Sequence, residues 1–207
     1  MKNSVELIGY YGDDTIHACS AWTSTSRNLT EEKVGRIPKL LKMLADGGHM
    51  TPFEKSSLHF LVDTDIASHI HLLKHRIGVS INGESARYKE IKEDKYLIPS
   101  DWPENWKTLL ADYNKEGNRL YHKCVYDLIE VGFSKKRAKE TARFFKSYNS
   151  QIQADVMFNW RSFFHFLNLR NQLEAQKEIR EIAAEMLQLV KNIEGNPFEH
   201  TIKAFNL

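Results

Sequence analysis

The sequence predicts an α+β fold, a single domain over residues 1–207 with a central β-sheet flanked by helices and a helical outer layer. The first observation is that the chain has 207 residues, 42% hydrophobic and 27% charged, as in an ordinary globular domain. The second is that short β-branched or alternating apolar segments indicate strands. The third is that longer stretches repeat their apolar residues at helical spacing.

The first quarter of the chain predicts one strand followed by two helices. Val5–Tyr10 is short, apolar and β-branched, and a helix is expected over Ile16–Trp22. Thr30 is a suitable N-cap for a second helix, which Pro38 is expected to divide and Gly47 to end. The apolar residues of this helix recur at helical spacing, at Val34, Ile37, Leu41 and Leu44.

The middle of the chain predicts a second strand, a helix, a loop and a long helix. Leu58–Val62 alternates like a strand, and Ile66–His75 has the length of a helix that leads into a loop-like basic motif. Tyr96–Pro99 resembles a short edge segment, and Pro103–Val131 should be a charged helix with proline in its first turn. Its expected inward residues are Leu109, Leu120 and Leu128.

The last third predicts helices almost throughout. Ser134–Tyr148 should be a basic helix, whose simplest explanation is a solvated face. Asn159–Ile193 is expected to be helical throughout and to stop near Gly195 and Pro197. One apolar stripe on its second part comprises Ile179, Ile182, Met186 and Val190.

Composition excludes several functional classes. The net charge of +2, from 29 basic and 27 acidic side chains, provides no excess for non-specific nucleic-acid binding. Cys19 and Cys124 lie far apart without CxxC spacing, so neither a disulfide scaffold nor a thiolate zinc site is indicated. No apolar run approaches the roughly 18 residues of a membrane span. We therefore expect a cytoplasmic protein with no nucleic-acid or membrane partner.

The segment KHRIGVSINGESARY, residues 74–88, has the composition of an anion site. It alternates cations with small donors and glycines, at Lys74, His75, Arg76, Ser80, Asn82, Ser85 and Arg87. Arginine offers a planar fork to phosphate oxygens, and glycine permits close approach of the backbone. A P-loop is rejected because Glu84 stands where the lysine belongs. A solvent-exposed basic loop is the simpler alternative.

A second polar pattern lies on the predicted helix that begins at Asn159. At roughly 100° per residue, Asn159 and Arg170 fall on one side, and Arg161, His165 and Asn168 fall on another. Phenylalanine and leucine fill the arcs between, so these polar side chains should meet anionic or acceptor partners. Internal salt bridges are the alternative.

Histidines next to the basic motif allow a metal interpretation. His71 and His75 would lie one helical turn apart, with His69 nearby. No acidic residue stands between them to act as a base, and the neighbouring cations disfavour a metal ion. We therefore expect no metal.

Three segments, in order along the chain, resemble the flavin-dependent thymidylate synthases. The family signature Arg-His-Arg, spacer, Ser-x-Arg-Tyr is read here as KHR, eight residues and SARY, residues 74–88, with lysine replacing the first arginine. GHMTPFEK, residues 48–55, is similar to the element Gly-His-x-Thr-Pro-Phe-Glu-His. NWRSFFHFLNLR, residues 159–170, is similar to the helix Asn-x-Arg-Ser...Phe-x-x-Leu-Arg.

The resemblance implies methylation of dUMP to dTMP with methylenetetrahydrofolate, NADPH and FAD, by a homotetramer that binds FAD without a Rossmann element. The implied FAD contacts are Thr51, Lys74, His75, Arg76, Gly83, Asn159, Arg161 and His165. The implied dUMP contacts are His71, Lys74, Glu84, Ser85, Ala86, Arg87, Arg143 and Arg170. Arg170 matches the family arginine that holds the ionised uracil, which makes it the expected catalytic residue.

Two other functions stay open at this point. The basic helix and the KHR loop would also suit a nucleic-acid-binding module without catalysis. Alternatively, the chain is a family member that lost its activity through departures from the family pattern. Those departures are at Lys55, Lys74 and Glu174.

Overall fold

The structure, a computed structural model, describes residues 1–85, 87–91 and 93–207. It divides into two compact units, and each is described by itself. Unit 1 comprises Met1–Ser4, Val62–Leu72 and Asn82–Ala154. Unit 2 comprises Val5–Leu61, Leu73–Ile81 and Asp155–Leu207. That the whole chain is a single domain stays a prediction.

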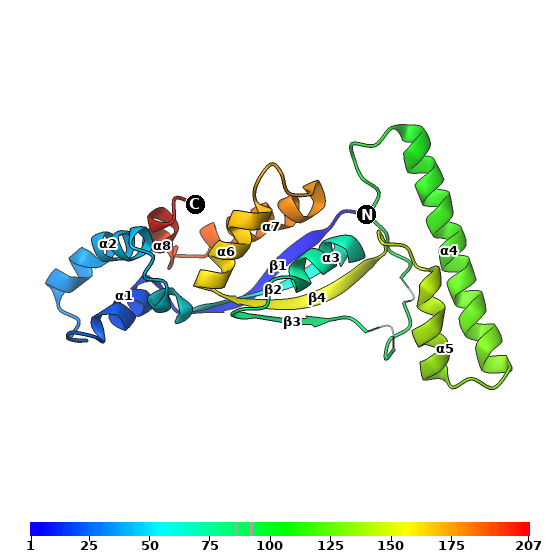
Figure 1. Ribbon diagram of the computed structural model, residues 1–207, viewed down its shortest axis with the longest axis horizontal. Helices are drawn as coiled ribbons and strands as arrows, with labels where there is room; N and C mark the ends of the chain where they lie inside the picture. The colour runs from blue at the N-terminus through cyan, green and yellow to red at the C-terminus, as the bar shows by residue number, and fades with distance from the viewer. Residues whose placement is uncertain (86, 92) are drawn as a thin grey trace. The chain divides into compact units, whose positions relative to one another are not determined.

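The chain forms one four-stranded sheet, in which the neighbouring strands lie in the order β1-β2-β4-β3 (Figure 1). Its strands are β1 Ser4–Tyr11, β2 Ser57–Asp65, β3 Val79–Gly83 and β4 Gln151–Asn159. The Asn159 amide donates to the Gly78 carbonyl, and the Glu84 amide donates to the Gln153 carbonyl. Positions therefore rise along one strand as they fall along the other, so β3 and β4 are antiparallel. The α+β class is confirmed.

Unit 2 buries aromatic side chains between its part of the sheet and its helices. These helices are α1 Asp14–Trp22, α2 Glu31–Asp46, η1 Thr51–Glu54, α6 Trp160–Arg170, α7 Lys177–Lys191 and α8 Glu199–Ala204. Phe60 of β2 stacks on Phe163 of α6 with ring centroids 5.7 Å apart. Trp160, at the start of α6, stacks on Phe198 at 5.0 Å. All four rings are fully buried, so this cluster fixes α6 on the sheet.

A buried polar network joins α1 and α8 to Ser56, which lies between η1 and β2, within unit 2. The Asp14 carboxylate accepts hydrogen bonds from the His200 amide at 2.7 Å and from the Thr201 amide at 2.8 Å. The His17 ring is within hydrogen-bond distance of Thr201 Oγ1, at 2.9 Å, and of Ser56 Oγ, at 2.8 Å. Burial lowers the pKa of His17 to about 4, so this ring is neutral at pH 7.

Unit 1 is mainly helical. It contains most of α3 Ile66–Leu73, together with α4 Glu104–Glu130, α5 Lys135–Ala142 and η2 Arg143–Phe145. Lys146 follows η2 with only 2% of its side chain exposed, and its Nζ lies 2.6 Å from Asp94 Oδ1. The same ammonium lies 2.7 Å from Asn118 Oδ1 and 4.6 Å from the centre of the Tyr121 ring. This lysine therefore belongs to the packing of unit 1.

The N-terminal elements match their predictions except at Pro38 and Val34. Thr30 caps α2 by accepting from the Lys33 amide, and Gly47 ends the helix, as expected. The predicted interruption is wrong because α2 continues through Pro38, which is exposed. Ile37, Leu41 and Leu44 are buried as predicted, but Val34 is 48% exposed.

The middle elements differ more from their predictions. The helix expected to reach His75 ends at Leu73, and the loop-like motif contains β3. The inward face of α4 is formed by Asn114, Asn118, Tyr121 and Val125. Leu109 was expected there but is 57% exposed, so that assignment is wrong.

Two predicted C-terminal helices were too long. The basic helix ends at Ala142 and is followed by η2. Asn159 closes β4 and caps α6, and α6 ends at Arg170, so continuous helix from Asn159 to Ile193 is wrong. The stripe on α7 is buried as predicted. Within the described ranges, no helix has the length and apolar character that crossing a membrane requires.

Candidate functional site

The first part of the basic motif is hydrogen-bonded, through Ile77 and Gly78, to the first turn of α6 in unit 2. Ser162 Oγ donates to the Ile77 carbonyl at 2.6 Å, and the Asn159 amide donates to the Gly78 carbonyl at 3.1 Å. Asn159 Oδ1 accepts from the Ser162 amide at 2.8 Å, which caps the helix. A Cβ on Gly78 would lie 2.4 Å from both Asn159 Nδ2 and Ser162 Oγ. Glycine is therefore required at this contact.

This attachment places the KHR triplet beside α6, around a hollow of about 220 Å³. The hollow is lined by Lys74, His75, Arg76, Ile77, Val79, Ser162, His165, Leu169 and Arg170. None of these described lining residues is acidic, whereas three carry a fixed positive charge and two are histidines. Uncompensated positive charge in a recess favours an anion. The residues around positions 74–76 and Arg170 therefore have the charge that an anion site needs, and the site itself stays a prediction.

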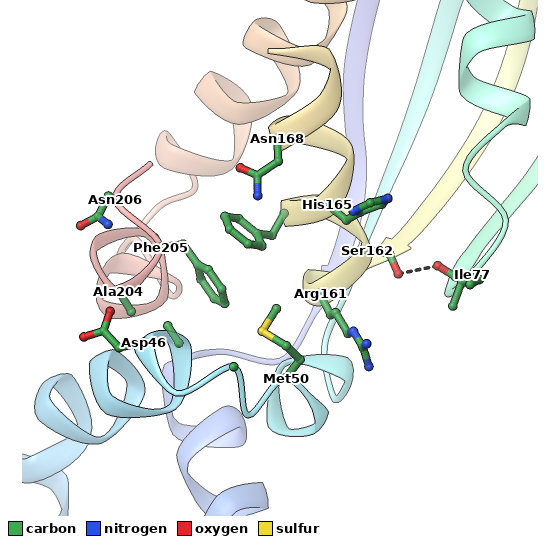
Figure 2. A pocket seen from close by; sticks show the side chains of 13 residues that line it. Asp46, Met50, Ile77, Arg161, Ser162, His165, Asn168, Ala204, Phe205 and Asn206 are labelled. Atoms are coloured by element: carbon green, nitrogen blue, oxygen red, sulfur yellow. Dashed lines mark hydrogen bonds between the residues drawn. The ribbon is translucent and has the colours of Figure 1, made fainter. Parts of the chain in front are cut away.

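A larger cavity of about 530 Å³ adjoins this hollow, because Ile77, Ser162 and His165 line both. Figure 2 shows Phe205, Met50 and Asn168 pointing toward one another across it. Its full lining is Ala45, Asp46, Gly48, Met50, Ile77, Arg161, Ser162, Phe164, His165, Asn168, Ala204, Phe205 and Asn206. The predicted polar stripe of Arg161, His165 and Asn168 therefore faces a cavity with apolar walls.

Arg161 has a protein partner at the edge of the larger cavity. Its Nη1 donates to Glu54 Oε1 at 2.6 Å, and about half of its side chain is exposed. Such an exposed pair stabilises the fold by roughly 0–1 kcal/mol. The ion pair satisfies one end of the guanidinium, so the salt-bridge alternative holds for Arg161 in part.

The second half of the motif lies in unit 1, as a turn after β3. The Ser85 carbonyl accepts from the Tyr88 amide at 3.1 Å and from the Lys89 amide at 3.0 Å, while Ser85 Oγ accepts from the Arg87 amide at 3.3 Å. Glu84 pairs with Lys89 at 2.5 Å, which raises the pKa of Lys89. Ala86, a predicted dUMP contact, lies outside the described residues. Arg87 is exposed.

The helix α5 lies against this turn within unit 1. Lys139 Nζ donates to the Tyr88 carbonyl at 2.9 Å, and Arg143 begins η2 one turn later with its side chain exposed. Two guanidinium groups, those of Arg87 and Arg143, are thus carried by neighbouring segments of one unit. This arrangement suits a phosphate, because both residues offer charged donors.

Gly83 and His71, the other two predicted contacts in unit 1, lie on β3 and α3. A Cβ on Gly83 would come within 3.2 Å of the His69 ring, so glycine permits the close approach of strand and helix. Burial lowers the pKa of His69. Because α3 ends at Leu73, His71 and His75 do not lie on one helix, as the metal interpretation had assumed.

Thr51, the remaining predicted FAD contact, begins η1 and lines a separate depression of about 390 Å³ in unit 2. His49 and Met43 are among its other lining residues. Across residues 1–85, 87–91 and 93–207, His, Cys, Asp and Glu side chains form no cluster of three that suits a metal ion.

Three contributors to the site were missed in the sequence. Ser162 anchors Ile77, Glu54 pairs with Arg161, and Phe205 forms a wall of the larger cavity. Ser162 and Glu54 had a usable signal, because they stand in the segments NWRSFFHFLNLR and GHMTPFEK that resemble family motifs. Phe205 had none, because it reaches the cavity through tertiary packing.

Comparison with known proteins shows the family of the chain. The profile of the family described as thymidylate synthase complementing protein matches residues 6–194. The chain belongs to this family. The flavin-dependent thymidylate synthase of Clostridium tetani is 30% identical over 187 residues, which cover 85% of this chain and 74% of that protein. The enzyme of that name from Pseudothermotoga lettingae is 29% identical over 202 residues, covering 93% and 86%.

A solved structure shares the fold. It is the UMP/dUMP methylase PolB from Streptomyces cacaoi, bound to 5-Br dUMP, with a TM-score of 0.77 and 23% sequence identity. The match covers 99% of this chain and 95% of that one. The predicted family, and with it the prediction of an enzyme of the flavin-dependent thymidylate synthase class, is confirmed.

Proposed function

We propose that the chain converts dUMP to dTMP by reductive methylation, with methylenetetrahydrofolate as carbon donor and NADPH-reduced FAD as hydride donor. The observation that carries the proposal is the acid-free cationic hollow of Lys74, Arg76 and Arg170, next to the larger cavity with apolar walls. A flavin nucleotide combines an apolar ring system with a diphosphate. It requires both kinds of surface side by side, so the residues present fit the cofactor.

The cofactor's part in the reaction is limited to hydride supply once NADPH has reduced it. The chain's part is binding and charge stabilisation. Lys74 and Arg76 offer cations to phosphate oxygens, while Phe205, Met50 and Ile77 provide apolar contact. Arg161, which is paired with Glu54, is proposed to contact polar atoms of the flavin nucleotide at the edge of the cavity.

Arg170 is proposed to hold the uracil base. A guanidinium opposite the base carbonyl and ring nitrogen favours the anionic form, so it stabilises charge that develops during transfer. Ser85, Arg87 and Arg143 of unit 1 are proposed to hold the nucleotide phosphate, supported by the exposed positions of Arg87 on the turn and of Arg143 on η2. No protein thiol is needed, and Cys19 and Cys124 line neither the hollow nor the larger cavity.

Two measurements test the proposal. Purified protein loaded with FAD should release tritium from dUMP labelled at C5, and release should require NADPH and methylenetetrahydrofolate. It should also show the visible absorption of a flavoprotein. A colourless protein that binds nucleic acid with steep salt dependence would instead favour the binding module. A yellow protein that releases no tritium would favour an inactive family member.

A further inference from the structure

His75 is the buried member of the KHR triplet. Only 7% of the residue is exposed, whereas Lys74 and Arg76 on either side are exposed. The edge of one ring meets the face of the other between His75 and Phe166, with centroids 5.1 Å apart and planes at 80°; the His165 ring lies 5.9 Å away. Both neighbours belong to α6. The His75 ring is therefore packed against α6, the helix that carries Arg170.

The ring contacts Arg170 through a hydrogen bond of defined direction. Arg170 Nε donates to His75 Nε2 at 3.1 Å. A guanidinium can only donate, so Nε2 must present its lone pair, and the proton of the neutral ring is on Nδ1. The bond uses the Nε–H of Arg170 and leaves the terminal amino groups as donors for another partner.

The position of His75 is fixed independently of any ligand. Two residues after it, the Ile77 carbonyl accepts from Ser162 Oγ at 2.6 Å, and the next carbonyl, that of Gly78, accepts from the Asn159 amide. Both anchors are at the first turn of α6, and Arg170 is at its last residue. A rigid segment and a rigid helix therefore hold the donor and the acceptor together.

We infer that His75 is a positioning residue, which directs the Arg170 guanidinium so that its terminal amino groups face the uracil base. This inference rests on the proposed function. An arginine side chain alone has many rotamers, and a fixed Nε contact selects among them before substrate binds. The charged and titratable groups near His75 include Lys74 and Arg76 on its own segment and His165 and Arg170 on α6, which are basic. A neutral acceptor is the only form of the ring that serves this role.

Two variants separate the hydrogen-bond acceptor of His75 from the packing of its ring. In His75→Phe the ring packing is kept and the acceptor is lost, whereas in His75→Gln the amide oxygen can replace Nε2. In the FAD-loaded protein, His75→Phe should raise the dissociation constant of dUMP by about tenfold, the value of a hydrogen bond to a charged group. His75→Gln should recover most of the affinity. Calorimetric titration with dUMP measures both.

Equal weakening by the two variants, or no weakening by either, would overturn the inference. If the wild-type protein does not bind dUMP, that result counts against the proposed function and not against the role of His75.

A second experiment then tests the role of His75 without dUMP. The Arg170 Nε–H signal in nitrogen-15 NMR, assigned by its loss in Arg170→Lys, should persist in His75→Gln and weaken through solvent exchange in His75→Phe. The contrast variant His165→Phe should lower FAD retention and leave this signal in place. An Arg170 signal equally protected in His75→Phe would show that His75 does not hold Arg170.

Discussion

Arg170 has a proposed catalytic role, and the packing of the fold does not depend on its side chain. The side chain is only half-buried at the last residue of α6, and it lines the cationic hollow. Arg170→Ala should therefore keep the fold and the FAD absorbance. Turnover of dUMP should fall about 100-fold, as expected when a donor to developing negative charge is removed.

The matched control for this substitution is Arg180→Ala. Arg180 is an arginine of α7 that donates to the Leu173 carbonyl at 3.1 Å and lines neither cavity. Its variant should keep wild-type turnover. Equal tritium release by Arg170→Ala and the parent would refute the role given to Arg170.

Gly78 is the residue on which the attachment of the motif depends. Gly78 and Gly48 share a φ of +67°, but an added Cβ meets two atoms at 2.4 Å at Gly78 and open space at Gly48. Alanine at Gly48 should cost about 1–2 kcal/mol in free energy of unfolding from backbone strain alone. Alanine at Gly78 should cost about 1–3 kcal/mol more, from the overpacked contact.

Urea unfolding of the two glycine variants measures this difference. If both lose the same stability, the close approach of Gly78 to Asn159 and Ser162 does not exist in solution.

At this scale the sequence identified residue types better than their partners. The stripe of Arg161, His165 and Asn168 was predictable because helical periodicity alone places these residues together. The pairing of Arg161 with Glu54 was not, because 107 residues separate them and only the packing of η1 beside α6 brings them together. For the same reason the contact of His75 with Arg170 could not be anticipated.

The elements of unit 2 are joined by a buried histidine, which makes their stability depend on pH. In the folded chain the pKa of His17 is about 4, against the ordinary value of 6.5 for a histidine. Below pH 6.5 the unfolded chain takes up a proton that the folded chain refuses, so stability falls as the pH falls from 6.5 toward 4. Between pH 7 and pH 5 this ring should remove about 2 kcal/mol of unfolding free energy.

The His17→Gln variant isolates this contribution from that of other titrating groups. Its amide can still reach Ser56 and Thr201, but it does not titrate. Unfolding free energies at pH 7 and pH 5 should differ by about 2 kcal/mol less in the variant than in the parent. An unchanged pH dependence in the variant would contradict the buried neutral ring.

Predictions of secondary structure were wrong where tertiary contacts outweigh the preference of the local sequence. β3, with the sequence VSING, contains residues of low strand propensity and exists because it pairs with β4. β4 itself had a readable signal, since Ala154, Val156 and Phe158 alternate and are all buried. The exposed Pro38 failed as a helix breaker because the packing of Ile37 and Leu41 outweighs its local cost.

For the whole molecule, the resemblance implies a homotetramer, and we propose one. Sedimentation equilibrium of the FAD-loaded protein should give a mass about four times that of the 24.1 kDa chain. A monomer at micromolar concentration, with full activity, would contradict the proposed tetramer.

The family could be recognised from three ordered motifs because each is made of residues that chemistry constrains. Comparison over residues 6–194 confirms it. The α+β class followed from patterning, whereas the sheet order β1-β2-β4-β3 depends on pairings between distant segments that no local pattern specifies. The lysine at position 74 still lines the hollow, so this departure from the signature retains the charge there.

The most direct test of the central claim is a single turnover followed by absorbance. Protein-bound FAD is reduced anaerobically with NADPH, which is then removed, and dUMP is added with methylenetetrahydrofolate. The proposed function predicts that the flavin absorbance returns only when dUMP is present, with one dTMP formed for each flavin reoxidised. Flavin that stays reduced, or that reoxidises equally without dUMP, would contradict it.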